Sequence, residues 1–292
     1  MTVPAENPGF PHPHNAILMR SFQDIASFTL PFYAGRKGEI RAHGTGTLLS
    51  VGGRYFIVTA SHVLDDFKNG IAPFFLPPRE DEGPPFPLQP KDAINWPLSA
   101  GVAREHDPID LCIVELTAES AEHLAARRRF AQLSDLGSSR DQQPGLYLMT
   151  GYPLENEVYR SEQKLSMTEA RNYITELHDE IADPDRGLKF QLWVKYPRDR
   201  LITSRGYEPR FPDPNGISGC GVWKLLPKPI DAWTERDRRL VAVEHTHVQN
   251  KQLIKATRIE LVLQMLATEY PDLIPEIAAG FQGNPSDHDL TP

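Results

Sequence analysis

The chain is organised around Pro214-Asn215-Gly216-Ile217-Ser218-Gly219-Cys220-Gly221-Val222-Trp223, a stretch in which one serine lies among three glycines. Glycine is used where the backbone must adopt a positive φ or pass close to another group. A serine in such a loop presents its hydroxyl, and the backbone N–H groups around it can face an anion. Acyl transfer needs this arrangement, because preorganised donors stabilise the charge that develops on the attacked carbonyl oxygen. Taken alone, a glycine-rich turn leading into a strand is the simpler interpretation.

Two other stretches supply a base and a carboxylate. His62 ends the run Tyr55-Phe56-Ile57-Val58-Thr59-Ala60-Ser61-His62, in which apolar residues give way to small ones. Asp110 opens Asp110-Leu111-Cys112-Ile113-Val114-Glu115-Leu116, which is typical of a buried strand. The three groups therefore occur in the chain order His62, Asp110, Ser218.

In this order the sequence resembles the chymotrypsin-like (trypsin-fold) serine peptidases. Thr59-Ala60-Ser61-His62-Val63 resembles the family's TAAHC block, and Ile109-Asp110-Leu111 resembles its DIAL block. Asn215-Gly216-Ile217-Ser218-Gly219-Cys220 resembles its GDSGGP block. Gly44-Thr45-Gly46-Thr47 resembles the G-S-G strand that precedes the histidine in bacterial members. Each block is only moderately specific, but four blocks in the right order favour this family.

Two other classes share a serine, histidine and acid. An α/β-hydrolase has the elbow G-x-S-x-G and the order serine, acid, histidine. Here Cys220 occupies the place of the second glycine, and the histidine precedes the serine. A subtilisin would place the aspartate before the histidine. Neither class fits the sequence.

The resemblance implies an all-β fold: two antiparallel six-stranded β-barrels with a C-terminal α-helix and an active site between the barrels. We predict a flexible N-terminal tail at 1–20, a first barrel with a connecting helix at 21–140, a second barrel with the helix at 141–275, and a polar tail at 276–292.

Hydrophobic patterning predicts the individual elements. Strands are expected at 22–33, 38–50, 146–153, 188–196 and 240–244. Helices are expected at 118–133 and 255–270. A proline-rich exposed loop is expected at 77–97, and the segment 165–181 is expected to begin as a strand and turn helical near 169–179.

The resemblance assigns a role to each group of a catalytic triad. His62 would be the general base, Asp110 would orient its imidazole ring, and Ser218 would be the nucleophile. The backbone N–H groups of Gly216 and Ser218 would form the oxyanion hole. Asp107 is the competing acid, but Asp110 is the one joined to the predicted buried strand.

No cofactor or metal is expected for this reaction. His245 and His247 lie at i and i+2, which would place both on one face of a strand. No further cluster of Cys, His or Asp completes a zinc site in the sequence. The sequence therefore predicts no metal site.

The resemblance also implies which residues bind substrate. Pro212 takes the position at the base of the primary pocket, and Asp213 is adjacent to it. Glu244, His245 and Thr246 lie on the strand expected to form the other wall. Two acids near one pocket favour a basic substrate side chain. The alternative is a small apolar pocket, in which Asp213 caps a turn and Glu244 faces solvent.

Two positions depart from the family pattern. Secreted members carry an aspartate before the serine, and it pairs with a new N-terminal amine after zymogen cleavage. Here that position is Ile217, so this activation route is not expected. Cys220 stands where the family often has proline or glycine, and its thiol is either packing or redox-sensitive. These departures keep open the alternative of a pseudoenzyme or peptide-binding scaffold, and of an activating protein partner.

Composition limits the location and the partners. The net charge of −8 argues against nucleic acid and anionic membrane as partners. A peptide or protein substrate is what the resemblance implies. No stretch approaches the ~20 apolar residues of a membrane span, and the first residues lack the layout of a secretory signal. Secreted relatives carry several disulfides, whereas only Cys112 and Cys220 occur here, both expected to be free thiols. The sequence predicts an intracellular, cytoplasmic enzyme.

Overall fold

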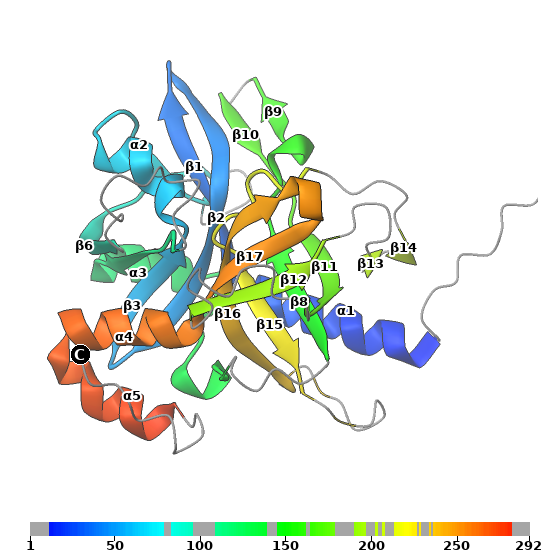
Figure 1. Cartoon of the computed structure of the whole chain (residues 1–292). Helices are drawn as coiled ribbons and strands as arrows, with labels where there is room; N and C mark the ends of the chain where they lie inside the picture. Colours follow the sequence, from blue (N-terminus) through cyan, green and yellow to red (C-terminus); the bar gives the residue numbers. More distant parts are fainter. Residues whose placement is uncertain are drawn as a thin grey trace, which may run out of the picture.

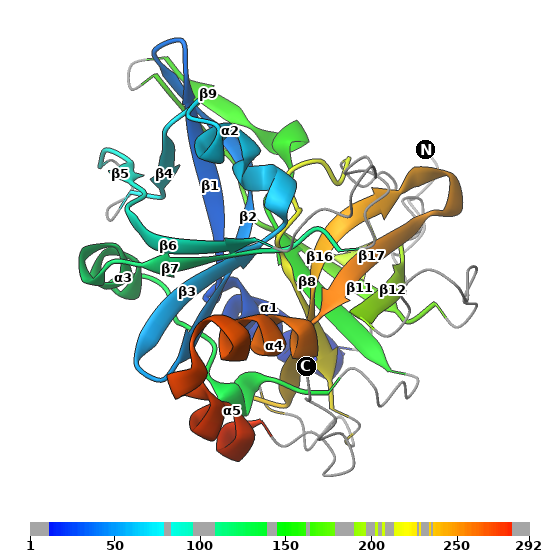
Figure 2. The same cartoon turned by 60° about the vertical axis from the view of Figure 1, so that its left-hand side comes forward.

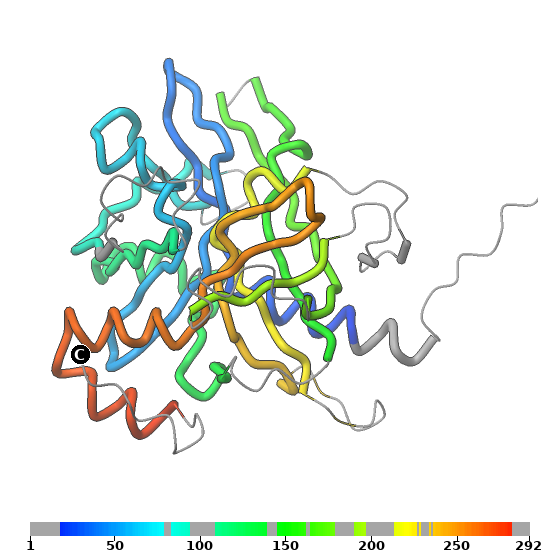
Figure 3. The backbone as a smooth tube through the Cα atoms, viewed as in Figure 1, coloured from blue at the N-terminus to red at the C-terminus, as the bar shows by residue number. Residues whose placement is uncertain are grey.

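A computed structural model of the chain describes residues 12–78, 83–95, 109–138, 145–161, 164–178, 190–196, 202–203, 206–207, 213–226, 228, 234 and 236–281. Figure 3 traces the backbone with the other residues in grey. Within the described part, two curled β-sheets of nine and eight strands stand side by side (Figure 1). The predicted all-β class, with two antiparallel sheets and a C-terminal helix, is confirmed.

The first sheet has the strand order β5-β4-β1-β2-β3-β7-β6, with the hairpin β9–β10 added beside β2. Its strands are β1 Thr29–Arg36, β2 Glu39–Val51, β3 Arg54–Thr59, β4 Phe74–Leu76, β5 Phe86–Pro87, β6 Pro90–Asn95, β7 Cys112–Leu116, β9 Val158–Arg160 and β10 Leu165–Met167. All pairs are antiparallel except the single contact between β10 and β2.

The second sheet has the order β12-β17-β16-β15-β8-β11-β13-β14 and is antiparallel throughout. Its strands are β8 Leu146–Gly151, β11 Arg171–Glu176, β12 Gln191–Lys195, β13 Ile202–Thr203, β14 Gly206–Tyr207, β15 Gly221–Leu225, β16 Arg238–Val248 and β17 Leu253–Arg258. β8 is the first strand of this sheet in chain order, as expected from the sequence.

The described part of the chain also contains five α-helices. These are α1 His12–Ala26, α2 Asp65–Lys68, α3 Ala118–Ala125, α4 Ile259–Glu269 and α5 Ile274–Gly280. Each sheet encloses its own apolar cluster, and the largest cluster joins Phe22 of α1, Phe56 of β3, Trp223 of β15 and Leu261 of α4. Figure 2 shows α4 across the base of both sheets. None of the described helices is long and apolar enough to cross a lipid bilayer.

The N-terminal prediction is wrong in two respects. Residues from His12 to Ala26 form a helix, where a tail to residue 20 and then a strand from residue 22 were expected. Leu18, Phe22 and Ile25 are buried, and their spacing suits one helical face better than a strand. β1 begins only at Thr29.

Three segments expected to be helix or loop contain strands. β5 and β6 lie within 77–97, because an edge strand tolerates proline at its first residue. β11 replaces the helix near 169–179, where Tyr173, Ile174 and Thr175 favour a strand. β17 occupies the first part of 255–270, and α4 begins at Ile259.

Three boundaries also need correction. The helix predicted at 118–133 ends at Ala125, and Ala131 beyond it bridges to Leu49 of β2. The hairpin β9–β10, assigned to the second barrel, pairs with β2 of the first sheet. The tail predicted from residue 276 begins as the last turns of α5.

Candidate active site

His62 and Asp110 are brought together by a pair of neighbouring strands. β3 ends at Thr59, and the 3-10 turn Ser61–Leu64 that follows carries His62, with Val63 and Leu64 buried beneath it. Asp110 lies just before β7, and Thr59 pairs with Cys112 across the two strands. The C-terminal end of β3 therefore lies against the N-terminal end of β7.

The two side chains contact each other through both carboxylate oxygens. His62 Nδ1 lies 2.5 Å from Asp110 Oδ2, and the backbone N–H of His62 donates to Asp110 Oδ1 at 3.1 Å. The Asp110 side chain is 5 % exposed and that of His62 is 40 % exposed. Burial alone would raise the pKa of Asp110, but the hydrogen bonds and charge of His62 outweigh it and lower the pKa. This carboxylate is therefore ionised and fixes one edge of the imidazole ring.

The loop before β15 holds Ser218 in a conformation that depends on glycine. Gly216 and Gly219 have φ of +96° and +99°, a region that other residues rarely adopt. A Cβ on Gly219 would lie 2.0 Å from the carbonyl oxygen of Thr45, which leaves no room for a side chain. The glycine pattern of the sequence thus corresponds to a real backbone requirement.

Threonines of β2 bind this loop across the boundary between the sheets. Thr45 Oγ1 donates to the carbonyl of Gly216 at 2.7 Å, and Thr47 Oγ1 donates to that of Gly219 at 2.9 Å. The backbone N–H of Thr45 donates to the carbonyl of Ser218 at 3.1 Å. Neither threonine was predicted to position the serine. Their alternation on one strand face, together with the glycines between them, was the available signal.

Two backbone donors of the loop have no acceptor among the residues described. The N–H groups of Ile217, Gly219 and Cys220 donate to carbonyls of Pro214, Glu244 and Ile217, and these bonds fix the loop. For Gly216 and Ser218, no described group accepts from the backbone N–H. These are the two donors that the sequence assigns to an oxyanion hole.

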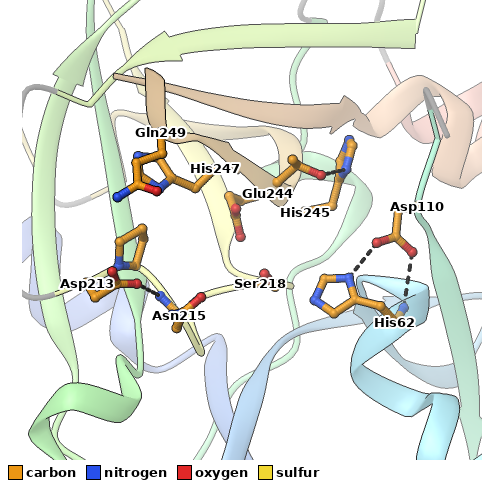
Figure 4. A pocket seen from close by; sticks show the side chains of 11 residues that line it. His62, Asp110, Asp213, Asn215, Ser218, Glu244, His245, His247 and Gln249 are labelled. Atoms are coloured by element: carbon orange, nitrogen blue, oxygen red, sulfur yellow. Dashed lines mark hydrogen bonds and ion pairs between the residues drawn. The ribbon is translucent and has the colours of Figure 1, made fainter. Parts of the chain in front are cut away.

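A cleft of about 430 Å³ gathers these groups at the junction of the sheets. Figure 4 shows the imidazole of His62 between Asp110 and Ser218, with its free edge toward the serine. Of the residues predicted to bind substrate, Asp213, Glu244, His245 and Thr246 line the cleft, and Pro212 lies outside the described residues. Asp107 also lies outside them. The cleft is completed by Pro214, Asn215, His247 and Gln249, which were not predicted to bind substrate.

The sequence predicted that Glu244 either lies on the pocket wall as a charged acid or faces solvent, and the structure matches neither prediction. Its side chain is buried beneath the cleft, 1 % exposed, so it does not face solvent. Burial raises its pKa to about 8, with a further rise from the charge of Asp110, and the Ser218 hydroxyl partly offsets this through a hydrogen bond. Near neutral pH the carboxyl is therefore mostly protonated.

The neighbouring groups of the cleft are neutral or already bonded. Burial lowers the pKa of His245 to about 3, so this imidazole is uncharged at neutral pH, and its Nδ1 lies 2.8 Å from Thr246 Oγ1. Asp213 Oδ1 accepts from the backbone N–H of Asn215 at 3.0 Å, which is the turn-capping role considered in the sequence. Within the described residues, no group of three or more His, Cys, Asp or Glu is arranged to hold a metal ion.

Ile217, which precedes Ser218, and Cys220, which lies two residues after it, are both buried. Ile217 is fully buried against Gly151, where an added Cβ would lie 2.7 Å from the Cβ of Ile217. Cys220 is fully buried in the same cluster, and burial raises its pKa well above the usual thiol value. Cys112 and Cys220 are both free, as predicted. A protonated, buried Cys220 packs and is not poised to react.

The chain was compared with protein-family models, curated proteins and solved structures. No family model matches the sequence, and no curated protein matches it. Among solved structures, neuropsin, a serine protease expressed in the limbic system of mouse brain, is similar with a TM-score of 0.49 and 13 % identity, over 91 % of this chain and 97 % of neuropsin. The crystal structure of Deg5 is similar with a TM-score of 0.47 and 15 % identity, over 89 % of this chain and 98 % of Deg5.

Proposed function

We propose that the protein is a serine endopeptidase that cleaves peptide bonds through an acyl-enzyme. The observation that carries the proposal is the contact of 2.5 Å between His62 Nδ1 and Asp110 Oδ2, in a cleft that also contains Ser218. The chemistry follows from these groups, because a serine hydroxyl becomes a strong nucleophile only when a base accepts its proton.

In the proposed reaction, Ser218 Oγ attacks the carbonyl carbon and its proton passes to His62 Nε2. The oxyanion that forms accepts from the N–H groups of Gly216 and Ser218, and the ionised Asp110 stabilises the imidazolium. His62 then donates the proton to the leaving amine, and the C–N bond breaks. A water molecule, deprotonated by His62, releases the acid and restores the serine.

One observation favours the alternative of a peptide-binding pseudoenzyme. Within the described contacts, no hydrogen bond joins Ser218 to His62. Such a bond is often long in a free enzyme and tightens only when substrate binds. We therefore keep catalysis as the proposal and the binding module as its rival.

A fluorophosphonate probe separates the two functions, because it forms a covalent bond only with an activated serine. We expect the probe to label the wild type and not Ser218→Ala, and Ser218→Ala to lose about 10⁶ in turnover while it remains folded. Ser61→Ala is the matched control, since Ser61 is buried and bonded to Lys68 outside the cleft. Absence of labelling in a folded wild type would leave the binding module as the function.

We also propose a cellular compartment and a mode of activation. Two free buried thiols agree with a reducing, cytoplasmic compartment. The apolar surroundings of Ile217 give no partner to a new N-terminal ammonium, so we propose that the enzyme does not depend on zymogen cleavage.

A further inference from the structure

A second cavity, of about 300 Å³, lies apart from the active-site cleft and shares no residue with it. Its walls come from β1, the segment after β4, the end of α3, the turn after β8, and β10. Apolar walls are formed by Pro31, Pro78, Leu124 and Met167. Its polar lining residues are Tyr33, His123, Arg127, Arg128, Tyr152 and Thr168. The cavity thus combines apolar walls with two arginines.

Arg128 and Arg171 are two described arginines whose buried Nε has no described acceptor, and Arg128 is the one that lines this cavity. Arg41, Arg54, Arg129 and Arg238, by contrast, each have a carboxylate within salt-bridge distance. Arg128 has none among the described residues, although its side chain is half-buried, and its buried Nε has no acceptor there. The one described hydrogen bond of its side chain runs from Nη2 to Tyr152 Oη, at 3.3 Å. A half-buried guanidinium whose Nε has no acceptor can gain charge-assisted hydrogen bonds from an anion in the cavity.

The other groups of the cavity do not neutralise this charge. Burial raises the pKa of Tyr33 and of Tyr152, so both phenols stay protonated. The Nε2 of His123 contacts the carbonyl of Pro77, and Arg127 adds a second guanidinium to the lining. A carboxylate or phosphate fits Arg128 because it can accept two parallel N–H bonds.

Tyr152 connects this cavity to the serine loop through short hydrogen bonds. The backbone N–H of Tyr152 donates to Thr45 Oγ1 at 3.0 Å. The Thr45 hydroxyl in turn donates to the carbonyl of Gly216 at 2.7 Å. Two residues further on, the N–H of Leu154 donates to the carbonyl of Asn215 at 2.8 Å. A displacement of the Tyr152 turn therefore moves the backbone that presents Ser218.

We propose that the cavity is an effector site for a small organic anion, whose carboxylate or phosphate binds Arg128 and whose apolar part packs on the prolines and Met167. Occupancy is transmitted through Tyr152 and Thr45 to the loop that carries Gly216 and Ser218. The binding site stands on its own, whereas an effect on catalysis rests on the proposed peptidase function.

Isothermal titration calorimetry at fixed ionic strength tests the site, with benzoate as the carboxylate probe and phenyl phosphate as the phosphate probe. We expect saturable binding of at least one probe to the wild type, weakened about tenfold or more in Arg128→Gln, which corresponds to about 1.4 kcal/mol. Arg236→Gln removes the same charge from an exposed position outside the cavity and should bind as the wild type does. The tighter probe identifies the anion. Failure of both probes to bind the wild type, or equal binding by Arg128→Gln, would overturn the site.

Amide hydrogen exchange of residues 213–220 tests the transmission without any need for activity. We expect the bound probe to slow exchange in this loop in the wild type and in Thr45→Ser. Thr45→Val lacks the hydroxyl, so it should bind the probe and show no change. Binding without a change in the wild-type loop would overturn the transmission. A changed loop in a protein that fluorophosphonate never labels would instead refute the peptidase function and leave the effector site standing.

Discussion

The hydroxyl of Thr45 donates a 2.7 Å hydrogen bond to the carbonyl oxygen of Gly216, and so joins the two sheets at the point where the serine loop turns. The same oxygen accepts from the backbone N–H of Tyr152. Thr45 is fully buried, so water cannot replace either bond. The conformation of the loop is thus a property of both sheets assembled together.

Replacing Thr45 by valine should destabilise the protein and disorder the serine loop. The change leaves a buried carbonyl and a buried N–H without partners, at a cost of about 2 kcal/mol or more. Chemical denaturation would measure the loss, and Thr45→Ser, which keeps the hydroxyl, should recover most of it. Equal stability of the valine and serine variants would show that the hydroxyl does not hold the loop.

Asp110→Asn should lower turnover by about 10⁴ near neutral pH, because an amide cannot stabilise the imidazolium as a carboxylate does. The measurement is steady-state hydrolysis of a peptide substrate. Asp107→Asn is the comparison variant, since Asp107 is the rival acid in the sequence, and it should keep nearly full turnover. The reverse result would move the orienting role to Asp107.

The proximity of His62 and Asp110 could be expected from the sequence for a local reason. Each lies beside a short apolar strand, β3 or β7, and neighbouring strands bring their opposite ends together. The backbone conformation of Gly216 and Gly219 could also be predicted from the sequence, because a positive φ restricts the choice of residue. The family pattern could then be matched block by block.

The predictions from sequence were wrong where tertiary contacts outweigh the local sequence pattern. α1 was mistaken for tail and strand, although its apolar residues, with Phe22 and Ile25, form one helical face that packs into the core. β11 was expected to be helical, but its pairing with β8 decides the outcome. The burial of Glu244 could not be predicted, since strand alternation does not reveal which face of β16 is closed.

Ile217→Asp should destabilise the protein by several kcal/mol, because its carboxylate would be buried in a cluster of apolar side chains. Ile217→Val is the matched control and should cost about 1 kcal/mol. Thermal unfolding distinguishes the two. An Ile217→Asp variant as stable as Ile217→Val would reveal a basic group within reach of this position, and with it an activation route like that of zymogens.

Glu244 should make the stability of the fold depend on pH. Its folded pKa of about 8 is raised above the value of about 4.3 for an unfolded chain. The stabilisation is complete below the unfolded pKa and is lost as the pH rises through the folded one. His245 acts in the opposite sense: its pKa of about 3 lies below the unfolded value of about 6.5, so its contribution is lost only as the pH falls.

Between about pH 6.5 and pH 8, the titration of Glu244 therefore changes the free energy of unfolding, and that of His245 does not. In this window the wild type should lose about 1.4 kcal/mol per pH unit relative to Glu244→Gln, whose amide does not titrate. Urea denaturation at several pH values gives both curves. Parallel curves for the two proteins would mean that Glu244 is already ionised in the folded state.

The titration of Glu244 also affects substrate preference. The sequence allowed either a basic or a small apolar substrate side chain. Asp213 is engaged with Asn215, so the group that can supply a new negative charge to the cleft is Glu244. Its carboxyl is mostly neutral near pH 7 and ionises as the pH rises toward 9. A basic side chain would be favoured by the ionised form and gain less from the neutral one.

We therefore expect the ratio of kcat/KM for an arginine substrate to that for a matched neutral substrate to rise between about pH 7 and pH 9, approaching about tenfold for one fully developed charge interaction of 1.4 kcal/mol. Any pH effect on the catalytic step that both substrates share cancels in the ratio, and arginine itself stays protonated throughout. Glu244→Gln should make the ratio constant with pH, whereas Asp213→Asn should leave its pH dependence in place. A ratio that is constant in the wild type, or that favours the neutral substrate at every pH, would assign the cleft to small or apolar side chains.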